Sequence, residues 1–123
     1  MSLSKSILKD VAMAGADLSG ALFKFVSLNS AGEFILPAAS GNPVYGVVTE
    51  PATAGNPVTV DVLGIVKVEA GATVATGAVV QTNAAGEAIT AVAGTTPVGI
   101  ARKGGADGEI IEVLMTQPFN AAT

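Results

Sequence analysis

The chain has 123 residues and a mass of 12.0 kDa, which is enough for one small domain with its own core. Half of the residues are hydrophobic and only 13% are charged, against about 25% in a typical soluble domain, so we expect subunit contacts to cover part of the surface. The net charge of −4 argues against a nucleic-acid groove. The absence of cysteine and histidine excludes disulfides, thiolate zinc sites and histidine-based catalysis.

The first 13 residues differ from the rest in charge and pattern. They contain Lys5, Lys9 and only one acidic residue, Asp10, whereas the remaining chain is acidic. These charges interrupt the apolar run, so no signal peptide is evident. Residues 2–13 fit either a short helix with a narrow apolar stripe or an unpaired tail. We expect residues 1–13 to form an extended N-terminal arm outside the core.

Short apolar segments bounded by glycine, asparagine or proline follow the arm and predict an all-β fold. In residues 58–69, valines alternate with polar residues at the period of a half-buried strand. Gly64 lies on the inward face of this segment, which indicates a bend that turns a barrel corner or carries the strand between two sheets. The other expected strands are residues 22–28, 34–36, 44–49, 78–82, 88–92, 98–102 and 109–116.

The sequence repeats itself at an offset near 54 residues. Residues 29–35, Asn-Ser-Ala-Gly-Glu-Phe-Ile, return as residues 83–89, Asn-Ala-Ala-Gly-Glu-Ala-Ile. The offset falls to 51 between residues 58–63 and 109–114, as small loop deletions would produce. We therefore expect a small β-barrel or β-sandwich built from two duplicated halves. The halves are about 14–63 and 70–114, in a single β domain of residues 14–118 that is followed by a tail of residues 119–123.

The residues that could carry chemistry do not form a catalytic set. Residues 29–32 and 83–86 are typical of hairpin turns, with a metal loop as the less favoured alternative. Residues 104–108 lack the strand-to-helix context of a phosphate loop. Glu109 and Glu112 have opposite strand parity, so they diverge and are expected to be solvated. We expect no enzyme, no catalytic residue, no metal or other cofactor, and no small-molecule substrate.

Tyr45 is the only tyrosine and interrupts the otherwise matched repeat. Such a residue can be an anchor in a subunit interface or a core tyrosine with a paired hydroxyl, and the sequence supports both readings. The longest apolar stretch lies between Glu69 and Glu87 and is interrupted by glycine, glutamine and asparagine. We expect no membrane-spanning segment there.

Five segments carry a family resemblance through their order and spacing. They are Ala-Gly-Ala-Asp-Leu-Ser at 14–19, Phe-Val-Ser-Leu-Asn-Ser-Ala-Gly at 25–32, the strand 44–48, Ala-Gly-Ala-Thr-Val-Ala-Thr-Gly at 70–77 and Gly-Glu-Ile-Ile-Glu-Val-Leu at 108–114. Together they resemble the capsid cement, or head decoration, proteins of tailed bacteriophages.

The resemblance implies a non-enzymatic protein that binds the outer surface of an expanded phage head and clamps neighbouring major capsid subunits. It also implies a homotrimer, made in the host cytoplasm and located on the outer capsid surface of the virion. The alternative is a ligand- or carbohydrate-binding β module on a virion or cell surface. Four phenylalanines and one tyrosine support it weakly, because sugar platforms usually present exposed aromatic rings.

In a decoration protein, the arm is the segment that we expect to contact the major capsid protein, by pairing with an exposed edge strand of the shell. We expect Tyr45 to lie in the oligomer interface, and we expect neither nucleic acid nor membrane as a partner. The expected capsid-contact residues are Lys5, Ile7, Leu8, Lys9, Val11 and Met13.

Overall fold

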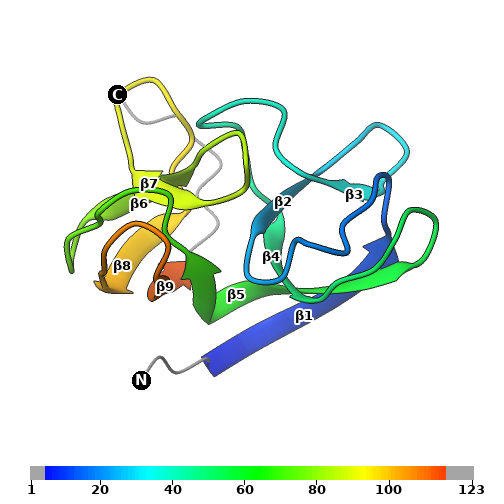
Figure 1. The fold of residues 1–123 in the computed structure, drawn as a ribbon, viewed down its shortest axis with the longest axis horizontal. Coiled ribbons are helices and arrows are strands. Elements are labelled where there is room, and N and C mark those ends of the chain that lie inside the picture. The colour runs from blue at the N-terminus through cyan, green and yellow to red at the C-terminus, as the bar shows by residue number, and fades with distance from the viewer. Residues whose placement is uncertain (1–4, 116–123) are drawn as a thin grey trace.

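The computed structural model describes residues 5–115, with side chains from residue 8 onward, and contains no helix in that range (Figure 1). One antiparallel sheet contains all nine strands in the order β3-β2-β4-β5-β9-β8-β6-β7, and β1 lies against β5. This curled half-barrel confirms the all-β prediction. The strands are β1 (Lys5–Met13), β2 (Phe25–Leu28), β3 (Phe34–Ile35), β4 (Gly46–Glu50), β5 (Pro57–Glu69), β6 (Val79–Thr82), β7 (Ala88–Thr90), β8 (Gly99–Lys103) and β9 (Ile110–Met115).

Each of the eight strands predicted after the arm overlaps an observed one. The described residues also contain no helix long and apolar enough to cross a bilayer.

The 13-residue strand β5 joins the two parts of the molecule. Figure 1 shows it passing from the group formed by β1, β2, β3 and β4 to the group formed by β6, β7, β8 and β9. It pairs with β4 before Gly64 and with β1 up to Ile65, and from Gly64 onward it pairs with β9. Gly64 is buried and has a φ of 105°, which L side chains rarely adopt. We call residues 5–63 the first half and residues 64–115 the second half.

The ladders of the second half have the same registers as those of the first. The β6–β7 pairs lie 54 residues after the β2–β3 pairs, and the β8–β9 pairs lie 53 residues after the β4–β5 pairs, including the irregularity in each ladder. The Ser27–Ile35 pair thus corresponds to Gln81–Ile89. The Val47–Asp61 pair corresponds to Ile100–Leu114. In the same way, the Lys9–Asp61 pair of β1 and β5 corresponds to the Ile65–Leu114 pair of β5 and β9.

This correspondence corrects the register expected for the last strand. The sequence match aligns Val58 with Glu109 as equivalent positions of the repeat. The strand ladders instead make Val58 equivalent to Ile111. A shift of two residues keeps every strand side chain on the same face, so a pattern of period two cannot distinguish the two registers. On the observed register, β1 corresponds to the second part of β5, which lies outside the halves expected from the sequence.

Residues 5–13 form a strand, so the expected helix or unpaired tail is wrong for this segment. β1 pairs with residues 57–65 of β5, and Ala12 packs against the core of the first half. Forming the first turn of a helix orders several residues but makes only one hydrogen bond. An extended segment beside β5 instead makes a series of backbone hydrogen bonds to a strand that is already formed. β1 therefore belongs to the same sheet as the other strands, and the division of the chain after residue 13 stays a prediction. The expected tail, residues 119–123, lies outside the described residues.

Two hydrophobic clusters form the core, and the larger one combines both halves. The first half contributes Phe25 and Val47 to it, although their neighbours Val26 and Val48 face the smaller cluster. The outer face of β2 and β4 therefore covers the core of the second half. The second half contributes Val66, Val68, Ala70, Val74, Val80, Ala88, Val98, Ala101, Ile111, Val113 and Met115.

Polar contacts hold residues 38–44 of the first half over the second half. The buried Gln81 donates from Nε2 to Ser40 Oγ at 3.0 Å, and its Oε1 accepts from Thr95 Oγ1 at 2.8 Å. The Gly41 amide donates to the Thr82 carbonyl at 2.9 Å. A Cβ on Gly41 would lie 2.4 Å from Thr95 Cγ2, so the two loops are in tight contact.

The Gly64→Val variant tests the bend. A β-branched residue at a φ of 105° is strained, so we expect the free energy of unfolding to fall by about 2 kcal/mol or more and Tm by roughly 8 °C. Gly20→Ala is the control, because a Cβ there meets nothing within 4 Å. Equal melting of Gly64→Val and the wild type in thermal denaturation would contradict the role assigned to Gly64.

Candidate functional site

The exposed side of β1 is the first candidate contact surface. Leu8, Val11 and Met13 are 48%, 56% and 50% exposed. Among the strands of the described range, only β5 pairs with β1, so the other edge of β1 is not used in the sheet. The side chains of Lys5 and Ile7 lie outside the described set. An exposed edge next to apolar side chains is suited to strand addition by a partner.

Lys9 has a role inside the chain. Its Nζ lies 2.6 Å from Asp61 Oδ1, and the Asp61 side chain is only 2% exposed. A buried carboxylate without a cation is strongly unfavourable, so this ion pair attaches β1 to β5. Lys9 therefore supports the surface formed by Val11 and Met13 and keeps part of its side chain in solvent.

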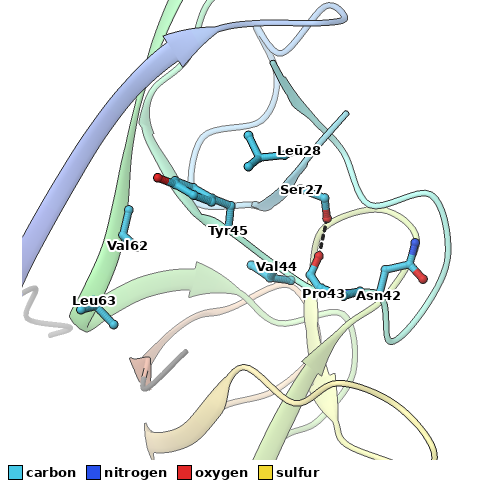
Figure 2. Close-up of a pocket in the computed structure, with 8 residues that line it drawn as sticks. All are labelled: Ser27, Leu28, Asn42, Pro43, Val44, Tyr45, Val62 and Leu63. Carbon is cyan, nitrogen blue, oxygen red and sulfur yellow. Dashed lines mark hydrogen bonds between the residues drawn. The ribbon is translucent and has the colours of Figure 1, made fainter. Parts of the chain in front are cut away.

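The second candidate is a cavity of about 590 Å³, open to solvent, beside Tyr45 (Figure 2). We call it the Tyr45 groove. Its walls are Ser27 and Leu28 at the end of β2, residues 42–45, and Val62 and Leu63 in the middle of β5. The Ser27 hydroxyl donates to the Pro43 carbonyl at 2.6 Å and thereby joins two walls. Most of the lining is aliphatic, so the groove is suited to apolar side chains.

Tyr45 is half-buried at this groove. Its ring centroid lies 5.4 Å from that of Phe34 at an interplanar angle of 41°, and its hydroxyl donates to Asp10 Oδ2 at 2.5 Å. This hydrogen bond raises the pKa of the Tyr45 phenol and lowers the pKa of the Asp10 carboxyl. The hydroxyl is therefore paired, as expected for a core tyrosine, while the interface role of Tyr45 stays a prediction.

The turn asparagines are structural. Asn29 Oδ1 accepts the amides of Ala31 and Glu33, each at 2.9 Å, and Asn29 Nδ2 donates to the Glu33 carboxylate. Asn83 makes the same contacts with Ala85 and Glu87. These asparagines fold back onto the local backbone, as in the predicted hairpin turns. No group of three or more acidic, histidine or cysteine side chains within residues 5–115 could hold a metal.

Glu112 is not the solvated residue that strand parity suggested. It is 2% exposed and forms an ion pair with Arg102. Glu109 is exposed, and its Oε1 accepts the Ala106 amide. The sequence identified Tyr45 but missed the groove around it, because Leu28 and Leu63 look like ordinary strand residues. The interruption of the repeat near position 45 was the only signal.

The single tyrosine and the absence of tryptophan allow the Tyr45–Asp10 contact to be tested directly. We expect the phenol of the folded protein to titrate above its ordinary pKa of 10.0, and Asp10→Asn to return the pKa toward that value. Because the folded pKa is raised, this contact stabilises the fold below pH 10 and its contribution is lost as the pH rises through the folded pKa. Ultraviolet absorbance of the phenolate measures the titration.

Asp17→Asn is the matched control, because Asp17 is an exposed carboxylate that accepts a hydrogen bond from the Ser19 amide. It should leave the phenol titration unchanged. The same titration curve for the wild type and Asp10→Asn would rule out the contact in solution.

Comparison with solved structures finds the same fold in a phage virion protein. The base of the head fiber gp8.5 of bacteriophage phi29 superposes with a TM-score of 0.71, covering 89% of this chain and 94% of that one at 18% sequence identity. No curated protein matches the sequence significantly. At the family level, residues 11–116 match the phage cement proteins, a group of capsid-associated structural proteins, and the chain therefore belongs to the phage cement protein family.

Proposed function

We propose that the protein is a non-enzymatic capsid decoration protein that binds the outer surface of an expanded phage head. It stabilises the head by holding neighbouring major capsid subunits together. The observation that carries this proposal is the family match, which extends over residues 11–116 and so covers nearly the whole described chain. The likeness to the base of a phage head fiber supports the fold of such a protein.

The surface of β1 is the proposed capsid contact. Binding would bury the exposed apolar side chains of Val11 and Met13 against the capsid. The outer edge of β1 would form backbone hydrogen bonds with an extended segment of the shell. The ion pair of Lys9 with Asp61 keeps β1 attached to the sheet, so a load on β1 reaches β5 and both cores. This connection is what a clamp between subunits requires.

We also propose that the chain consists of two copies of one unit. The equal registers of the two sets of ladders support a duplication, and so do the identical contacts of Asn29 and Asn83. The second part of β5 then opens the second copy as β1 opens the first. This continuity makes the two copies one rigid sheet.

A carbohydrate-binding module has less support. Phe25 and Phe34 are fully buried, and the Tyr45 ring is packed against Phe34 with its hydroxyl on Asp10. A sugar platform needs aromatic faces in solvent, and these three rings are engaged in the fold.

Polar substitutions on β1 test the capsid contact. We expect the double variant Val11→Thr, Met13→Gln, which keeps side-chain size, to weaken binding to expanded shells of the cognate capsid protein about tenfold by removing apolar contact. Co-sedimentation with shells lacking the decoration protein measures the affinity. Deletion of the segment is a poorer test, because it also removes the partner of β5 and the cation beside Asp61.

The control double variant is Val92→Thr, Leu22→Gln, which removes similar exposed apolar surface outside β1. It should bind like the wild type. Unchanged binding of the β1 variant, or an equal loss in the control, would contradict the assignment of the contact to β1.

We propose a homotrimer as the assembled form, because low charge and exposed aliphatic side chains favour association. Light scattering should give three times the chain mass of 12.0 kDa in solution, or decoration should add copies in threes on the shell. A protein that is monomeric both in solution and on the shell would contradict the trimer.

A further inference from the structure

One row of aliphatic side chains crosses the outer face of the second half. Val79 on β6 pairs with Ile100 on β8, Ile100 pairs with Leu114 on β9, and Leu114 pairs with Ile65 on β5. Paired residues in antiparallel strands lie side by side on the same face. Val79, Ile100 and Leu114 are 45%, 45% and 40% exposed. We call these four residues the aliphatic row.

The corresponding face of the first half is covered. The register places Phe25 at the position of Val79 and Val47 at the position of Ile100. Phe25 and Val47 are 0% and 1% exposed, because they pack into the core of the second half. Within the chain, the outer face of the first half thus covers the core of the second half. The aliphatic row is the matching outer face of the second half, and no further core lies against it within the described residues.

The opposite surface shows the complementary difference. Positions that line the Tyr45 groove in the first half are buried in the second, where Val98 corresponds to Tyr45 and Thr82 to Leu28. In the second half, the loop of residues 38–44 covers them through the contacts of Gly41 and Gln81. Within the described residues, no such loop covers the first half, and Leu28 is 46% exposed.

We propose that the aliphatic row of one copy of this chain docks into the Tyr45 groove of a second copy, so that copies associate head to tail as the two halves do within the chain. This inference rests on the proposed homotrimer, to which it assigns the contact surfaces. A head-to-tail contact uses two different patches, and it closes into a ring when the rotation between copies fits. Each copy in such a trimer gives one row and receives one row.

Two lysine variants, one on each surface, test the arrangement. Ile100→Lys places a charge in the row and Leu28→Lys places one beside the groove; both sites are about half exposed, so the fold tolerates them. Each variant alone should associate at least about tenfold more weakly than the wild type, because a charge would be buried in an apolar contact. Light scattering and thermal melting are measured on the same samples.

Mixing the two variants gives the decisive result. The Ile100→Lys copy retains a native groove and the Leu28→Lys copy retains a native row, so the mixture should form a 1:1 complex that cannot close into a ring. Val92→Lys is the control, since Val92 is 59% exposed and belongs to neither surface, and it should remain trimeric.

Trimers formed by either variant alone, or a mixture that stays monomeric, would overturn the proposal. Groove variants that keep the trimer but lose binding to shells would overturn it in favour of a capsid segment as the occupant. Binding of the wild type to shells is measured separately. A wild type that binds shells as a monomer overturns this inference and leaves the capsid-binding function intact, whereas a wild type that does not bind shells overturns that function itself.

Discussion

The fold depends on one strand serving two cores. β5 runs for 13 residues, and its valines before Gly64 face the smaller cluster whereas those after it face the larger one. A regular strand of that length would keep one face toward one layer. The φ of 105° at Gly64 turns the strand, so Phe25 and Val47 of the first half reach the core of the second. Without that turn the halves would share a strand but no core.

Charge is used where the two halves meet and where the sheet has an edge. Lys24 Nζ lies 3.5 Å from Glu69 and 3.3 Å from Glu87, which connects the first half to the second. Asp61 is buried beside Lys9 at the β1 edge, whereas the corresponding position in the second half is Leu114. Buried ion pairs contribute little net stability, but they penalise alternative registers that leave a charge alone. Polar residues thus fix the position of β1, and aliphatic residues occupy the face left exposed.

Local features of this fold could be predicted from the sequence. Residues within a few positions of each other determine the turns at 29–32 and 83–86, the eight strands after β1 and the buried position of Gly64. All of these features are present in the structure. The strand β1 could not be predicted in the same way, because Lys9 finds its partner Asp61 52 residues away. The register of β9 was missed because a two-residue shift leaves the alternation unchanged. The groove was missed because burial at Leu28 depends on which other segment covers it.

The first half differs from the second beside the Tyr45 groove, which no other half covers within the described residues, and the differences form a partial cap. The register places Asp10 at the position of the core residue Val66 and Tyr45 at the position of Val98, and the Tyr45 hydroxyl donates to the Asp10 carboxylate. The ring of Tyr45 also packs on Phe34, so it covers part of the smaller core as Phe25 and Val47 cover the larger one. One tyrosine has less apolar surface than a whole sheet face, and the uncovered remainder is the groove. Tyr45 and Asp10 thus close part of the smaller core, and the hydrophobic groove beside them stays open to a partner.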